Sequence, residues 1–143
     1  MAVRKAQAVW KGTLGKGNGT MSLGSGSYNG SYSFSSRFEN GKGGNPEELL
    51  GAAFAGCFSM ALSMLLEQAG FPPESIRTEA SVSIDKAGDG FSITTISLDT
   101  QGTVPGCSDE IFQRQANAAK TGCPVAKALT GASVALHARL VQK

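Results

Sequence analysis

A long uncharged stretch, residues 49–66, predicts a long helix. The residues before it carry the signals of a helix start: Asn45 is a favourable N-cap and Pro46 suits the first helical position. The acidic Glu47 in the first turn interacts favourably with the helix dipole. We expect the helix to end near Gly70, because two prolines follow there.

Short alternating runs separated by glycine predict a meander of strands before this helix. Residues 12–44 are rich in turn formers, but they contain alternating segments and are therefore not expected to form a flexible linker. The clearest alternation runs from Tyr32 to Phe38 and predicts a strand. In a strand, Arg37 would lie on the face opposite Tyr32, Phe34 and Phe38.

Two further strands, two helices and a last strand are predicted after the long helix. The strands form a hairpin that turns at residues 88–90, and a shift in alternation between Ile93 and Ile96 indicates a bulge or a change of face. Ser108 caps a helix that ends by Gly122, a short helix covers 124–130, and a strand covers 134–140. This order predicts an α+β fold, a single domain over residues 1–143 and no internal repeat.

Composition indicates a globular chain and argues against a nucleic-acid partner. Of the 143 residues, 41% are hydrophobic and 17% are charged, as in folded domains. The net charge of +2 is too small to indicate a nucleic-acid partner. The first residues lack the apolar segment of a signal peptide, so we expect a cytoplasmic protein whose thiols stay reduced.

The uncharged stretch 49–66 has the length of a membrane span, but its composition argues against one. It is rich in glycine, alanine and serine, and its flanks are acidic rather than basic. A soluble helix that is apolar all round must be buried on all sides. Because a domain of this size can scarcely enclose such a helix, we expect a homodimer built on it and no membrane partner.

Two cysteines occupy unusual settings. Cys123 precedes Pro124 and would lie at a helix start, where free N–H groups favour a thiolate. The alternative is a small residue with no redox role. Cys57 lies in the middle of the apolar helix, where a cysteine is usually an inert small hydrophobe and burial disfavours the thiolate. To react near neutral pH it needs a nearby cation, which its own helix does not supply.

The remaining candidates for chemistry are weak. Cys107 precedes the second predicted helix in a loop and is expected to be a bystander. His137 is the only histidine and lies in the middle of a strand, which argues against a cysteine–histidine pair and against a histidine-rich metal site. The glycine-rich region lacks the motif of a phosphate-binding loop. We therefore expect no metal and no cofactor.

Two motifs are similar to those of a known family. The segment 44–58, Gly-Asn-Pro-Glu-Glu-Leu-Leu-Gly-Ala-Ala-Phe-Ala-Gly-Cys-Phe, resembles the signature helix of the OsmC/Ohr family. The segment 123–129, Cys-Pro-Val-Ala-Lys-Ala-Leu, resembles its second cysteine motif. The glycine-rich front with Arg37 and the length also agree, and they are most similar to the osmotically inducible OsmC branch.

The resemblance implies a thiol-dependent peroxidase that reduces organic hydroperoxides and, less efficiently, hydrogen peroxide. It implies Cys57 as the peroxidatic nucleophile, Cys123 as the resolving thiol, and Arg37 and Glu47 as further active-site residues. A dithiol reductant of lipoyl or thioredoxin type would reopen the disulfide. The implied fold has antiparallel sheets around a long central helix, in an intertwined homodimer with active sites at the interface.

These roles fit together physically. Arg37 would supply the missing cation for the Cys57 thiolate, and Glu47 would hold the guanidinium in a bidentate pair. An apolar pocket is expected to favour organic peroxides and to be lined by residues such as Phe54, Phe58 and Met60. Two alternatives remain open: a redox sensor that uses the same thiols, and a small-molecule carrier that uses the apolar pocket at the subunit interface.

Overall fold

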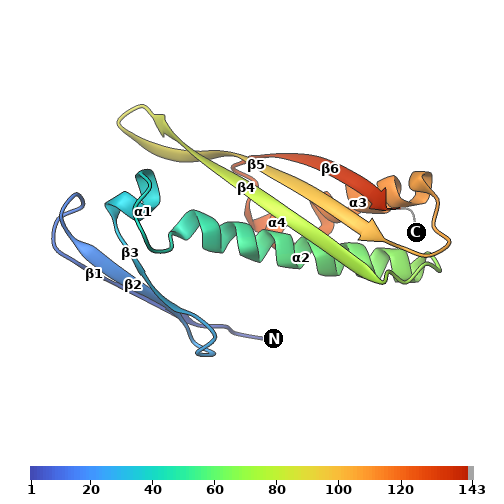
Figure 1. Cartoon of the computed structure of the whole chain (residues 1–143), viewed down its shortest axis with the longest axis horizontal. Coiled ribbons are helices and arrows are strands. Elements are labelled where there is room, and N and C mark those ends of the chain that lie inside the picture. The colour runs from blue at the N-terminus through green and yellow to red at the C-terminus, as the bar shows by residue number, and fades with distance from the viewer. Residues whose placement is uncertain (142–143) are drawn as a thin grey trace. The chain divides into compact units, whose positions relative to one another are not determined.

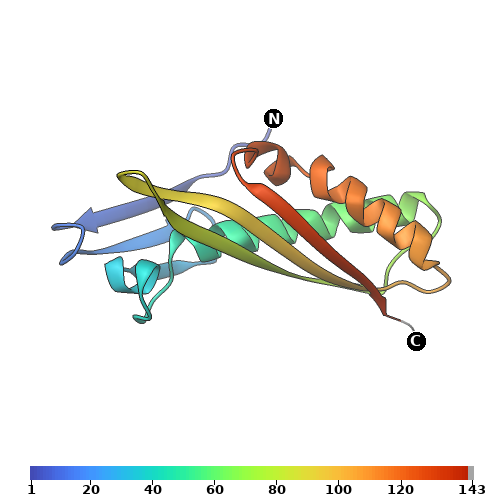
Figure 2. The ribbon, with the colours of Figure 1, turned by 90° about the horizontal axis from the view of Figure 1, so that it is seen from above.

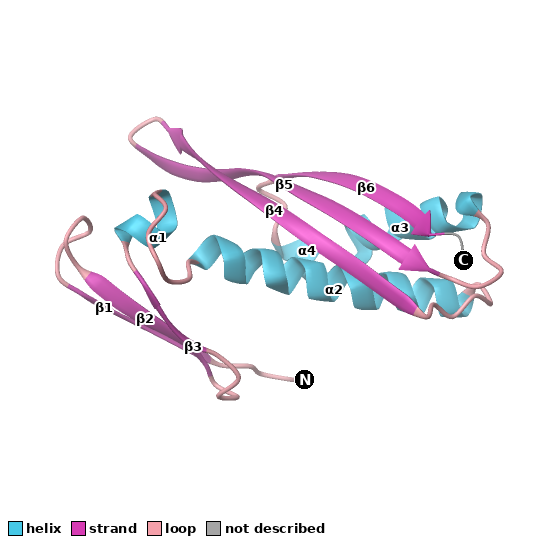
Figure 3. Cartoon of the chain, in the orientation of Figure 1, coloured by secondary structure: helices cyan, strands magenta, loops and turns pink. Residues whose placement is uncertain are grey.

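The computed structural model describes residues 1–141 and divides into two compact units, Met1–Leu49 and a second one that begins at Leu50. Each unit is described by itself. Strands and helices follow one another in the order β1-β2-β3-α1-α2-β4-β5-α3-α4-β6 (Figures 1 and 3). The α+β class is confirmed, and the single domain over 1–143 stays a prediction.

The first unit contains the predicted meander. Strands β1 (Ala6–Lys11), β2 (Asn18–Leu23) and β3 (Asn29–Tyr32) form an antiparallel sheet in that order. Trp10 and Tyr32 both pair with Gly19, and their rings lie 5.2 Å apart across it. A Cβ on Gly19 would lie 2.7 Å from each ring. The glycine therefore lets the two aromatic side chains meet over the middle strand.

The strand predicted over 32–38 is wrong, because a helix replaces most of it. Strand β3 ends at Tyr32, and Phe34–Phe38 form the short helix α1. Its N-cap is Ser33, whose hydroxyl accepts the Ser36 N–H, while the Ser36 hydroxyl accepts the Ser33 N–H. This reciprocal capping box outweighs the alternation of the side chains. Arg37 consequently lies on a helix and not on a strand face.

The second unit is a three-stranded sheet with helices on one face (Figures 1 and 2). Strands β4 (Ser75–Ala87) and β5 (Gly90–Thr103) form the predicted hairpin, and their register shifts so that Thr94 has no partner. The predicted bulge is therefore confirmed. Strand β6 (Ser133–Val141) runs parallel to β5, so the expectation of purely antiparallel sheets is wrong for this strand.

The parallel pairing has a topological cause. The chain leaves β5 and returns through helices α3 (Asp109–Gly122) and α4 (Pro124–Ala128) before it enters β6. Such a crossover lets the last strand enter the sheet in the direction of β5. Ser108 caps α3 as predicted, with its hydroxyl accepting the Ile111 N–H at 3.3 Å.

The long helix α2 (Pro46–Gln68) packs one stripe against the sheet. Its fully buried residues recur every four positions: Phe54, Phe58, Leu62 and Leu66. They join Ile96 and Leu98 of β5 and Phe112 of α3 in one hydrophobic core. The expectation that Phe54 and Phe58 line a pocket is therefore wrong, because both side chains are fully buried in the core.

The opposite face of α2 is apolar and exposed in the single chain. It carries small residues and two methionines, Ala52, Ala53, Gly56, Met60 and Met64. Met60 is 77% exposed in the single chain, so its place in an interface pocket stays a prediction. Within the described residues, α2 is the one helix long and apolar enough to cross a membrane, a test that core helices also pass. Its buried stripe belongs to the hydrophobic core of the second unit.

Candidate active site

Cys57 and Cys123 lie together in the second unit. Cys57 is half-buried on α2 and packs against the core, and Cys123 is a fully buried member of that core. Cys123 ends α3 and is the N-cap of α4. All three cysteines of the chain are free thiols.

The environment of Cys123 keeps it protonated at neutral pH. Burial is the largest cause and raises the pKa of the Cys123 thiol, and a hydrogen bond and charge repulsion from Cys57 raise this pKa further. The Ala126 N–H, which donates to Cys123 Sγ at 3.3 Å, lowers the pKa but does not outweigh burial. The predicted helix-start position is confirmed, whereas the raised pKa speaks against the predicted thiolate at Cys123, because the side chain is fully buried.

The Cys57 and Cys123 side chains lie close enough to interact. The interaction with Cys57 is one of the causes that raise the pKa of the Cys123 thiol. The structure therefore brings two free thiols together, one half-buried and one fully buried.

Arg37 and Glu47 form a charged pair within the first unit. Arg37 Nε donates to both carboxylate oxygens of Glu47, at 3.0 and 3.3 Å, and Nη2 donates to Oε1 at 2.8 Å. Glu47 is buried, and about a third of the Arg37 side chain is exposed. The predicted bidentate pair is confirmed as a contact.

The pair leaves one edge of the guanidinium available. The Phe38 ring lies 5.0 Å from Arg37 Cζ, which gives the cation a second support besides the carboxylate. Nη1 donates no hydrogen bond to the residues that the structure describes. An anion could therefore be met by this nitrogen without breaking the pair.

Cys107 and His137 have different surroundings from the two cysteines above. Cys107 is buried, its Sγ donates to the Ser108 carbonyl at 3.3 Å, and burial raises the pKa of its thiol. His137 is exposed on β6, paired in register with Asp99. No group of three or more metal-ligating side chains occurs within residues 1–141.

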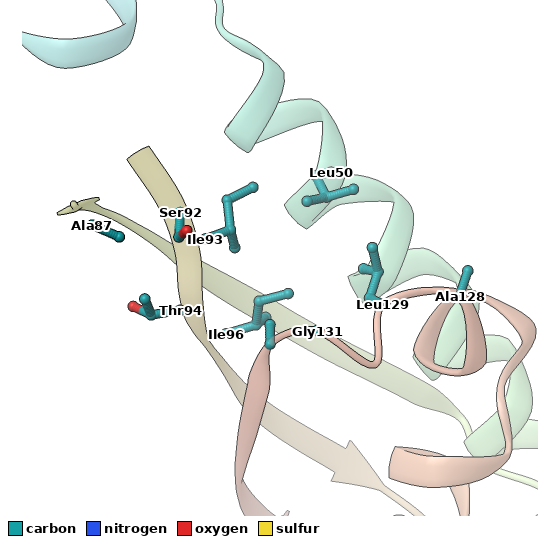
Figure 4. A pocket seen from close by; sticks show the side chains of 10 residues that line it. Leu50, Ala87, Ser92, Ile93, Thr94, Ile96, Ala128, Leu129 and Gly131 are labelled. Atoms are coloured by element: carbon teal, nitrogen blue, oxygen red, sulfur yellow. The ribbon is translucent and has the colours of Figure 1, made fainter. Parts of the chain in front are cut away.

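An apolar pocket of about 530 Å³ adjoins the elements that carry the two cysteines (Figure 4). Leu50 of α2 and Leu129, the C-cap of α4, line it together with Ile93 and Ile96 of β5. Leu50 precedes Cys57 by seven residues, which is two turns along the same helix face. The sequence analysis missed these residues, although the spacing of seven from Cys57 could have identified Leu50.

Comparison with known proteins gives concordant matches. The model of the OsmC family, described as OsmC-like protein, matches residues 39–137. The peroxiredoxin OsmC of Escherichia coli is 51% identical over 127 residues, which cover 88% of this chain and 89% of that protein.

Solved structures agree with these matches. The organic hydroperoxide resistance protein OhrB of Bacillus subtilis is similar with a TM-score of 0.73 and 26% identity, covering 94% of this chain and 97% of that one. An OsmC-like protein from Vibrio cholerae has a TM-score of 0.77, covers 96% of this chain and 99% of that one, and is 19% identical, which supports the fold alone.

Proposed function

Since the chain belongs to the OsmC family and is a peroxidase-type enzyme, we propose that it reduces organic hydroperoxides, and hydrogen peroxide less efficiently, through Cys57. The observation that carries the proposal is the contact between Cys57 and the protonated Cys123 thiol. In the proposal, this contact would bring a nucleophile and a resolving thiol together. The organic hydroperoxide resistance proteins among its structural relatives support this substrate class.

The proposed cycle needs no metal or prosthetic group. The Cys57 thiolate attacks one peroxide oxygen, the O–O bond breaks, and the alkoxide takes a proton and leaves as an alcohol. Cys57 is then a sulfenic acid. The Cys123 sulfur attacks the Cys57 sulfur, water leaves, and a disulfide forms. An external dithiol reopens the disulfide by exchange and becomes a disulfide itself.

In this proposal Arg37 supplies positive charge to the Cys57 thiolate and to the peroxide. Glu47 holds the guanidinium through the pair described above. Nη1, which makes none of the bonds to Glu47, is the part of Arg37 that would face the reacting atoms. The organic part of the substrate would occupy the apolar pocket that begins at Leu50.

We further propose a homodimer that covers the exposed apolar face of α2. In a single chain this face leaves Met60 and Met64 exposed. A second copy of α2 offers the same apolar stripe, and self-complementary faces are typical of two-fold dimers. The free thiols suit a reducing compartment, so we propose the cytoplasm, a lipoyl- or thioredoxin-type dithiol as reductant, and neither a membrane nor a nucleic acid as partner.

A peroxidase assay with a small dithiol tests the proposed function. We expect many equivalents of organic hydroperoxide to be consumed per chain, faster than hydrogen peroxide at equal concentration. A redox sensor would instead react once per chain. A carrier would bind an apolar ligand and continue to do so after Cys57 is removed. Stoichiometric consumption in the presence of excess dithiol would argue against an enzyme of this specificity.

Arg37→Ala is expected to lower the thiolate fraction of Cys57 at neutral pH. Loss of about 1.4 kcal/mol of charge stabilisation would slow alkylation at pH 7 about tenfold and shift its pH profile to higher pH. The measurement is the rate of iodoacetamide alkylation of Cys57 against pH. Arg114→Ala, which removes an exposed ion pair with Glu110, is the matched control and should leave the profile unchanged. An unchanged profile in Arg37→Ala would remove Arg37 from the site.

A further inference from the structure

Asn45 joins the two helices that carry the Arg37–Glu47 pair. Its side chain is buried, and Nδ2 donates to the Ser36 carbonyl at 3.1 Å and to Glu48 Oε1 at 3.0 Å. Its Oδ1 accepts the Glu48 N–H at 2.7 Å. The acceptor on one side and the donors on the other fix the orientation of the amide. One side chain therefore binds the backbone of α1 and the first turn of α2.

Helix α1 depends on such contacts because it has only five residues. Isolated helices of this length are not stable in water. Its capping box closes the first turn, and the Ser36 hydroxyl donates to the Gly44 carbonyl at 2.8 Å. The Asn45 amide also donates to the Ser36 carbonyl, which links this short helix to the start of α2. Ser36 is buried, so these bonds are protected from water.

The attachment points lie next to the charged pair in the sequence. Ser36 directly precedes Arg37, and Asn45 lies two residues before Glu47. Fixing the Ser36 carbonyl to the start of α2 therefore fixes the backbone of both partners relative to each other. An arginine fork needs such a fixed backbone to keep two parallel bonds to a carboxylate.

We propose that Asn45 is a positioning residue for the Arg37 guanidinium, acting through the bond from its amide to the Ser36 carbonyl. The proposal rests on the proposed function, in which Arg37 acts on Cys57. It differs from a plain N-cap role, which needs only the acceptor Oδ1. The donor Nδ2 distinguishes the two roles.

Asn45→Asp and Asn45→Ser separate the N-cap role from the bridge, which is the bond from the Asn45 amide to the Ser36 carbonyl. Both residues are good N-caps and can accept the Glu48 N–H. Aspartate presents an acceptor where the Ser36 carbonyl needs a donor, and serine is too short to span both contacts. Two variants guard against a failure of either one to fold. Ser108→Ala, which removes the cap of α3, is the matched control for a simple loss of helix capping.

Two measurements decide the proposal. Hydrogen exchange followed by mass spectrometry should show faster exchange over Phe34–Phe38 in both Asn45 variants, with α3 unchanged. The pH profile of Cys57 alkylation should shift to higher pH, as in Arg37→Ala. The reaction at pH 7 should therefore slow by about tenfold at most. Ser108→Ala should lower the melting temperature without moving that profile.

Each contrary result has a separate meaning. Unchanged exchange in α1 would overturn the bridge, and faster exchange with an unchanged alkylation profile would overturn its role for Arg37. Both measurements are made without peroxide, so a wild-type protein that fails to turn over peroxide would contradict the proposed function while the exchange result still decides the bridge.

Discussion

Replacing Cys57 with serine is expected to abolish peroxide turnover without unfolding the protein. Serine is close in size to cysteine and the position is only half-buried, so α2 should keep its packing. A hydroxyl is protonated at neutral pH and is a far weaker nucleophile towards peroxide than a thiolate. The measurement is dithiol-supported consumption of an organic hydroperoxide, which should fall to the rate of the dithiol alone.

Cys107→Ser is the matched control for this variant. Cys107 is buried and donates to a backbone carbonyl, a bond that a serine hydroxyl can also make. We expect near wild-type turnover from Cys107→Ser. Retained turnover in Cys57→Ser would assign the nucleophile to another residue.

Cys123→Ser is expected to stop the cycle one step later. Serine is a strong N-cap and should keep the start of α4 in place of the sulfur that accepts the Ala126 N–H. Cys57 should still react once with peroxide and gain one oxygen atom as a sulfenic acid, or become over-oxidised. Mass spectrometry of the intact protein measures this. Equal loss of the first oxidation in Cys57→Ser and Cys123→Ser would contradict the division of roles.

Local signals predicted most elements of the fold correctly. The start of α2 at Pro46, the cap at Ser108 and the bulge beside Ile93 were readable because each depends on neighbouring residues. Helix α1 was not predicted, because the alternating side chains of residues 32–38 indicated a strand. The capping serines Ser33 and Ser36 pointed to the helix instead. The direction of β6 depends on a crossover through α3 and α4, which no local pattern encodes.

The candidate site was predictable to a different degree for each residue. The contact between Arg37 and Glu47 was expected through the family resemblance and is confirmed, while its role remains a proposal. The thiolate expected at Cys123 followed from the helix start alone. Burial reverses that expectation, and the burial of one side chain depends on how three elements pack. The pocket was misplaced for the same reason, since Phe54 points into the core.

The position of Glu47 on the same helix as Cys57 leads to the remaining prediction. The two residues are ten positions apart on α2, a rise of about 15 Å at the usual 1.5 Å per residue, and they point about 80° apart around the axis. A glutamate side chain does not cover that distance. If both serve one reaction, we expect the Arg37–Glu47 pair of one subunit to act on Cys57 of the other, with two α2 helices packed about a two-fold axis.

Mixed dimers test this sharing, and two arrangements of the same two substitutions give opposite expectations. In the first, a Cys57→Ser chain pairs with a Glu47→Ala chain. A shared site then retains one intact combination, Cys57 of the second chain with Glu47 of the first, and about half of the wild-type turnover is expected. In the second, one chain carries both substitutions and its partner is wild type. Neither site is then complete, and turnover should fall to that of the Glu47→Ala homodimer or below.

Sites built within one chain would reverse the two results, because the wild-type chain of the second arrangement would keep a complete site. Differently tagged chains, purified as mixed dimers and assayed with an organic hydroperoxide and a dithiol, provide the measurement. Met60→Glu, which places a charge on the exposed apolar face of α2, should yield monomers without turnover. If Glu47 only stabilises the start of α2, by about 0.3–1 kcal/mol, both mixed dimers should behave alike. A fully active monomer would contradict an active site shared between two subunits.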